Sequence, residues 1–136
     1  MQAVSWSTYQ WWEDPLRYAF FRNEVIAMAR RFSGFTIARS VKKAGHLGWQ
    51  GWLRTNYGNV YRIEVVHRPS YPEQEPWVWV LGPGISALSP HRYADGNLCL
   101  HVDEWIPFRS TAVSSISAAA EWLLLYDHWR RTGQTW

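Results

Sequence analysis

The sequence has few features that could cross-link the chain, anchor it in a membrane or direct its export. Cys99 is the only cysteine among 136 residues, which excludes an internal disulfide. No apolar run approaches the ~20 residues that span a bilayer, and the segment after Met1 lacks the charged and apolar regions of a secretory signal. We therefore expect a cytoplasmic protein that keeps its thiol reduced and has no membrane partner.

Charge is neither abundant nor concentrated. The formal net charge is +3, and the only lysines are Lys42 and Lys43. No basic run exceeds two residues, whereas nucleic-acid-binding proteins usually concentrate basic charge in one stripe. One cysteine and five scattered histidines also give no pair with the close spacing of structural zinc ligands. The sequence thus predicts no nucleic-acid partner, no metal and no cofactor.

What the sequence has in excess is tryptophan, with 11 copies. Tryptophan brings a large apolar area at small entropic cost and is enriched in cores and interfaces. We expect half or more of these side chains in the core. The tryptophans nearest the two ends are predicted to face a protein partner: Trp11, Trp12, Trp129 and Trp136.

Two long helices are predicted. The first starts at Asp14-Pro15, because aspartate caps helices and proline favours the first helical position, and it ends before Ser33-Gly34. The second is capped by Ser110 or Thr111 and runs to about Arg130, with basic residues that suit the dipole of its last turn. Helical spacing predicts two buried faces: Leu16, Phe20, Phe21, Val25, Met28 and Phe32 in the first, and Val113, Ile116, Ala120, Leu123 and Leu124 in the second.

Strand signals lie between the helices. Residues 49–56 and 60–66 flank the turn Tyr57-Gly58-Asn59 and predict an antiparallel hairpin, and Trp77–Leu81 reads as a short apolar strand. The predicted order is a helix, a three- or four-stranded meander, a long loop and a second helix. Because the strands are joined too tightly for crossovers, we expect one α+β domain over residues 1–136 with an antiparallel sheet.

The long irregular stretch from residue 82 to residue 98 ends at Cys99. Such a stretch inside a compact domain is uncommon and usually functional. A lone cysteine is either a small buried hydrophobe or a nucleophile. Here the turn Asp95-Gly96 delivers the thiol between Leu98 and Leu100, at a junction of loop and core, which favours the nucleophile. A Cys–His protease is disfavoured, because no helix starts at this cysteine.

The residues around Cys99 resemble the signature of ubiquitin-conjugating enzymes. A Tyr-Pro-x-x-x-Pro corner lies at residues 71–76, Gly-x-x-Cys-Leu at 96–100 and Trp-x-Pro at 105–107, in the order of the family and at near-family spacing. The resemblance implies the ubiquitin-conjugating fold. It also implies that Cys99 is a nucleophile that carries a modifier as a thioester and transfers it to an amine.

The chain departs from this signature beside the cysteine. Where the family has His-Pro-Asn, ending eight residues before the cysteine, this chain has Ser89-Pro90-His91. His91 therefore replaces the asparagine and is the predicted second catalytic residue, as a hydrogen-bond donor to the tetrahedral intermediate or as a base. The alternative is that His91 only pins the loop. His101 is a weaker candidate, and Asp103 and Glu104 either orient the amine or lie on a solvated turn.

Other departures are a short gap between Cys99 and the Trp-x-Pro step and the lack of helices after the second one. In these respects the chain is similar to compact bacterial relatives found in anti-phage (CBASS) operons beside cGAS-like nucleotidyltransferases. The resemblance implies that the modifier is a ubiquitin-like protein or the C-terminus of such a nucleotidyltransferase. The other implied partners are an activating enzyme or other acyl donor and a protein target.

The same resemblance implies that the first helix docks the activating enzyme. Arg17, Arg22 and Arg30 are the candidate contacts on that helix. The alternative function is a catalytically inactive protein-binding module of the same fold, which holds partners without chemistry.

Overall fold

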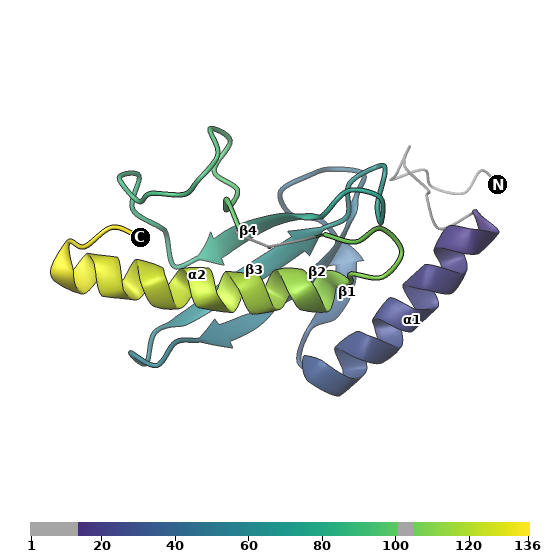
Figure 1. Cartoon of the computed structure of the whole chain (residues 1–136), viewed down its shortest axis with the longest axis horizontal. Coiled ribbons are helices and arrows are strands. Elements are labelled where there is room, and N and C mark those ends of the chain that lie inside the picture. Colours follow the sequence, from purple (N-terminus) through teal and green to yellow (C-terminus); the bar gives the residue numbers. More distant parts are fainter. Residues whose placement is uncertain (1–13, 101–104) are drawn as a thin grey trace.

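The computed structural model describes residues 14–100 and 105–136. The elements follow in this order: α1 (Pro15–Arg31), β1 (Thr36–Arg39), β2 (Leu47–Arg54), β3 (Val60–Val66), β4 (Trp77–Gly82) and α2 (Ala112–Thr132). In Figure 1, α2 lies along the sheet, and α1 lies near the N-terminal end of α2. The predicted α+β fold is confirmed. Within the described ranges, no helix has the length and apolar character needed to cross a membrane.

The four strands form one antiparallel sheet in sequence order. β2 pairs with β3 from Gly48 opposite Val66 to Arg54 opposite Val60, which confirms the predicted hairpin. Gly58 in its turn has a φ of 86°, a conformation that glycine adopts without the strain of a Cβ atom. β1 lies outside the three strands located from sequence, because four residues at the sheet edge give too short a pattern to detect.

The start of α1 is as predicted, but its buried face is only partly so: Phe20 and Met28 are buried as expected, and Leu16 and Val25 are not. The Asp14 carboxylate accepts a hydrogen bond from the backbone N–H of Leu16 at 2.9 Å and caps the helix. Leu16 itself is 65% exposed and Val25 is 40% exposed. Apolar spacing misplaced this face because a carboxylate, that of Glu24, lies at its centre. The buried residues of α1 are Phe20, Glu24 and Met28.

Helix α2 covers the sheet and begins where the sequence predicted. The Thr111 hydroxyl accepts from the Val113 N–H, and Gly133, with a φ of 77°, ends the helix by donating to the Trp129 carbonyl at 2.7 Å. Ala120, expected inside, is exposed. Ile116 and Leu123 are buried as predicted. The whole buried side consists of Ala112, Ser115, Ile116, Ala119, Trp122, Leu123, Tyr126 and Asp127.

The core lies between α2 and the sheet. Ile63, Val65, Ile116 and Leu123 have no exposed surface. Trp129 and Trp136, predicted to face a partner, are half-buried and pack against this core. They do so because α2 and the segment after it fold back over the sheet. Trp11 and Trp12 lie outside the described residues.

A close approach in the core gives a first testable prediction. A Cβ atom on Gly51 would lie 2.5 Å from the ring of Phe35, which is itself buried. Gly51→Ala must displace that ring, and we expect it to lower the free energy of unfolding by about 1–3 kcal/mol. Chemical denaturation measures the loss. Gly34→Ala, where a Cβ meets nothing within 4 Å, is the matched control and should change stability by less than about 0.5 kcal/mol. Equal effects of the two substitutions would contradict the prediction.

Candidate active site around Cys99

A tight turn precedes Cys99. The Tyr93 N–H donates to the Asn97 carbonyl at 2.9 Å, and the Gly96 N–H donates to the Tyr93 carbonyl at 2.9 Å. Gly96 has a φ of 97°, and the Asp95 carboxylate accepts from the Asn97 N–H. The predicted turn at Asp95-Gly96 is confirmed, and it reverses the chain so that residues before and after it lie side by side.

This turn presents Cys99 at the junction of loop and core. Leu98 is 3% exposed and donates its N–H to the Val78 carbonyl of β4 at 2.8 Å. Cys99 donates its own N–H to the His91 carbonyl at 2.9 Å. The side chain of Leu98 therefore anchors the segment in the core, while the cysteine next to it is only half-buried. These two backbone hydrogen bonds hold the segment in place, and Cys99 remains partly exposed.

His91 lies beside Cys99 through its backbone, and its side chain points to the end of the chain. Its carbonyl accepts from both the Cys99 N–H and the Trp122 indole, the latter at 3.1 Å. Its imidazole Nε2 is hydrogen-bonded to the backbone oxygen of Trp136, and the two rings lie 5.1 Å apart. His91 has a φ of 57°, a conformation that costs energy for a residue with a Cβ atom. The two predicted catalytic residues are thus neighbours.

Tyr93 is a site residue that the sequence analysis missed. Its phenol lies near the side chain of Cys99. Interaction with that side chain, through hydrogen bonding first and charge second, raises the pKa of Tyr93. The available signal was a tyrosine two residues after His91, inside a turn that leads to the cysteine.

The other candidates are only partly placed. His101, Asp103 and Glu104 lie outside the described residues. Arg22 and Arg30 of α1 are exposed. Within the described ranges, no group of three or more His, Cys, Asp or Glu side chains is arranged to hold a metal ion.

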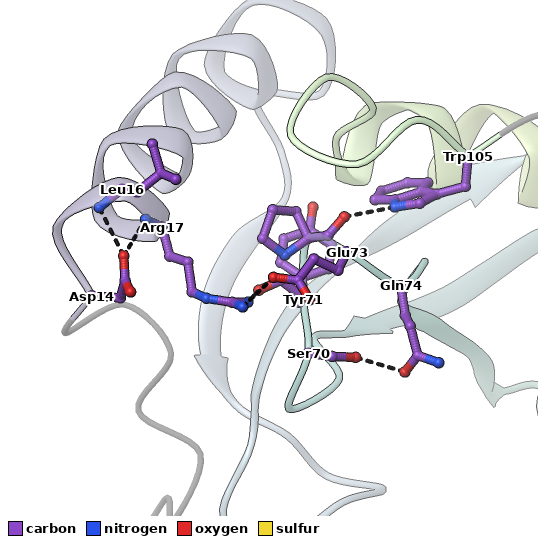
Figure 2. A network of polar contacts seen from close by, with 9 residues as sticks. Asp14, Leu16, Arg17, Ser70, Tyr71, Glu73, Gln74 and Trp105 are labelled. Carbon is purple, nitrogen blue, oxygen red and sulfur yellow. Dashed lines mark hydrogen bonds and ion pairs between the residues drawn. The ribbon is translucent and has the colours of Figure 1, made fainter.

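Arg17, the third predicted contact on α1, is engaged within the chain. Its guanidinium donates to the Tyr71 carbonyl at 2.7 Å and pairs with Glu73, as Figure 2 shows. Trp105, from the Trp-x-Pro step, donates its indole N–H to the Pro72 carbonyl at 2.8 Å. The Tyr-Pro corner is therefore clamped between α1 and the segment that follows the cysteine.

A buried carboxylate ties these parts together. Glu24 has no exposed surface and accepts from the Trp49 indole at 2.9 Å and the Ala112 N–H at 2.8 Å. It also accepts from the Tyr71 phenol and pairs with the His67 ring at 2.8 Å. Burial raises the pKa of Glu24, but the attraction to His67 and the hydrogen bonds outweigh burial and lower it. The group is thus held ionised in the core.

Comparisons with known proteins agree with this architecture. A family model described as "Type II CBASS E2 protein" matches residues 24–136. Ubiquitin-conjugating enzyme E2 W of Caenorhabditis elegans is 36% identical over 67 residues. That match covers 48% of this chain and 42% of the worm enzyme, so the chain spans less than half of the length of this curated relative.

Two solved structures have the same fold. Human ubiquitin-conjugating enzyme E2 G1 superposes with a TM-score of 0.54 at 14% identity, covering 76% of this chain and 90% of that one. The Vps23 UEV, solved in a complex with ubiquitin, superposes with a TM-score of 0.56 at 12% identity, covering 85% and 91%. At these identities the likeness shows the fold alone.

Proposed function

Since the chain belongs to the Type II CBASS E2 protein family, we propose that it carries an acyl group as a thioester on Cys99 and transfers it to an amine. The observation that carries this proposal is the placement of Cys99. Cys99 is half-buried, is held at the end of a tight turn and lies near the phenol of Tyr93. A partly exposed cysteine on a fixed backbone suits a nucleophile better than a packing residue.

The reaction consists of two acyl transfers. In the first, the Cys99 thiolate attacks the activated carbonyl of the donor, a C–S bond forms, and the leaving group departs with its electron pair. In the second, an amine attacks the thioester, a C–N bond forms, and the Cys99 thiolate leaves while the amine proton passes to a base. Cysteine suits both steps because its thiolate is a strong nucleophile and a good leaving group.

The family suggests the partners. The proposed acyl group is the C-terminal carbonyl of a ubiquitin-like modifier or of a cGAS-like nucleotidyltransferase. An activating enzyme or another acyl donor supplies it, a protein target receives it, and anti-phage defence is the proposed setting. The match to a CBASS family model supports this reading.

The test of the carrier function is acylation of the purified chain. It is incubated with ATP, the candidate modifier and an activating enzyme from a neighbouring gene, or with a short peptidyl thioester that needs no enzyme. We expect an adduct of one acyl group by intact mass, which reducing agent or hydroxylamine removes. No adduct with either donor contradicts the proposal.

The second candidate function is a binding module without chemistry. The observation in its favour is that His91 replaces the family asparagine and directs its imidazole to Trp136. In that case the chain binds its partner equally well with and without the thiol, and no covalent adduct forms under any of the conditions above.

In the carrier function we assign His91 to the transfer step. The Trp136 backbone oxygen only accepts hydrogen bonds, so it is Nε2 of His91 that carries a proton. In the neutral ring Nδ1 is then the basic atom. The contact with Trp136 therefore selects one tautomer of a histidine whose backbone is bonded to Cys99.

This assignment predicts the effect of His91→Ala. We expect single-turnover discharge of the thioester to an amine to slow by roughly 10²-fold, the usual contribution of a positioned acid, base or donor. Loading of Cys99 is the internal control and should persist. His91→Gln retains a donor but no base, so recovery by glutamine indicates hydrogen bonding and no recovery indicates base catalysis. If the thioester on His91→Ala is discharged at the wild-type rate at every pH, His91 has no catalytic role and only holds the loop in place.

A further inference from the structure

A pocket of about 590 Å³ lies apart from the site at Cys99. Its walls come from the turn between β2 and β3, the residues that follow β4, and the last two turns of α2. Figure 1 shows the β2–β3 turn and the C-terminal end of α2 at the same end of the molecule. Leu98, beside Cys99, instead pairs with Val78 near the start of β4. The pocket therefore has no part in the acyl-transfer steps described above.

The charged residues of this pocket give it a net positive charge. Arg130 and Arg131 line it together with one acidic residue, Asp127. Asp127 is 3% exposed, and its two carboxylate oxygens accept from the Tyr61 phenol, at 2.5 Å, and from the Thr55 hydroxyl. Both arginines are exposed, and among the described residues neither forms an ion pair with an acidic side chain. The charges that remain available to a ligand are therefore the two guanidinium groups.

Contacts with the walls place these two guanidinium groups. That of Arg131 lies 4.5 Å from the centre of the Tyr57 ring, a cation–π contact that restricts it. Burial is the main cause that raises the pKa of Tyr61, and the positive charge of Arg130 acts in the opposite direction, so this charge lies near the β3 wall. Basic residues also suit the dipole at the end of a helix. That role does not require the two side chains to line one pocket.

Two glycines leave the backbone of the other walls uncovered. Gly58 and Gly84 line the pocket, and a Cβ atom on either one would meet nothing within 4 Å. A ligand can therefore approach the backbone of both turns closely. Asn59, next to Gly58, adds an exposed side-chain amide to the same lining.

We propose that this pocket binds a small phosphate-bearing ligand, a phosphomonoester of nucleotide size. A phosphoryl group has three oxygens and can pair with both arginines at once, whereas a single arginine already engages both oxygens of a carboxylate. Its charge of nearly −2 also gains more from a net positive pocket than a monoanion does. The volume lies within the range of roughly 300–1,000 Å³ that is usual for small-molecule sites. The proposal does not depend on the carrier function of Cys99.

The test is a binding titration of the whole chain, followed by calorimetry and by the Nε–H resonances of the arginine side chains. The probes are AMP, ribose 5-phosphate and adenosine, which lacks the phosphoryl group. We expect at least one of the two phosphates to bind and to shift the resonances of Arg130 and Arg131, and adenosine to do neither. Binding of AMP alone identifies a nucleotide as the ligand class, and equal binding of both phosphates identifies a sugar phosphate.

Variants of the lining assign the binding to this pocket. Arg130→Ala should weaken it roughly 10-fold or more, the usual loss of a hydrogen bond between charged groups. The double variant Arg130→Ala, Arg131→Ala should abolish it. Arg30→Ala, an exposed arginine on α1, is the matched control and should bind as the wild type does. All of these side chains are exposed, so we expect every variant to fold, which thermal unfolding checks.

Three results would overturn the proposal. They are no binding of either phosphate at millimolar concentration, binding of adenosine as tight as that of AMP, and phosphate binding that the double variant retains. Cys99→Ala separates this pocket from the carrier function, because we expect it to bind the phosphate as the wild type does. Loss of binding in Cys99→Ala would place the ligand at the cysteine and would also reject this pocket. Failure of acylation with intact phosphate binding rejects the carrier function alone.

Discussion

Cys99→Ala is expected to abolish acyl transfer, with a loss of roughly 10⁴-fold or more in the rate of adduct formation. No other side chain at this turn offers a nucleophile of comparable strength. Cys99→Ser is expected to load far more slowly than wild type, because a serine hydroxyl has almost no anionic fraction at neutral pH. Any adduct that does form is an oxyester. It should resist the reducing agent that removes the wild-type adduct.

The measurement is intact mass after incubation with the same acyl donor, wild type beside both variants. Because Cys99 is half-buried, neither substitution should prevent folding, and thermal unfolding checks this. Lys42 and Lys43 are the only lysines, so an amine-linked adduct is located easily by digestion. An adduct of wild-type yield on Cys99→Ala, still removed by reducing agent, would contradict the assignment of the nucleophile.

The second large effect concerns stability. Glu24→Ala is expected to lower the free energy of unfolding by about 3–5 kcal/mol, because it leaves the buried partners of the carboxylate without an acceptor. These partners come from distant parts of the chain: Trp49, His67, Tyr71 and Ala112. Glu24→Gln keeps the shape but loses the charge, and it should recover only part of the loss. Denaturant titration measures both, and Glu121→Ala, exposed on α2, is the control.

The same carboxylate predicts a pH dependence. The pKa of Glu24 is lowered from 4.5 in the folded chain, so below pH 4.5 the unfolded chain binds more protons at this group. Its contribution is therefore present above pH 4.5 and is lost as the pH falls through the folded value. In Glu24→Gln the fall of unfolding free energy on acidification should be shallower than in wild type. Parallel curves for the two proteins would show that the network does not hold this charge.

Several elements could be predicted from the sequence because their signals are local. Asp14, Thr111 and the turn at Gly58 are caps and turns whose side chains or φ angles act on adjacent residues. The buried faces of the helices were less accurate. Glu24 lies inside and Leu16 outside, since apolar spacing takes no account of a buried carboxylate with four partners.

The residues of the candidate site also differ in whether a local sequence pattern predicts them. Cys99 was located by a motif and by the loop before it, and both are features of neighbouring residues. Tyr93 was missed, because its phenol comes near Cys99 only after the turn at Gly96 has folded the chain back. The contact between His91 and Trp136 joins residues 45 positions apart, and no local pattern encodes it.

The sequence by itself determined the order of helices and strands, the reversal at Asp95-Gly96 and which cysteine the proposed site contains. These depend on residue type and short-range spacing. Only the tertiary structure decided which groups surround that cysteine and that the imidazole of His91 lies against Trp136. The physical reason is that hydrogen bonds and burial across the core depend on how distant segments pack, whereas caps and turns depend on adjacent backbone angles.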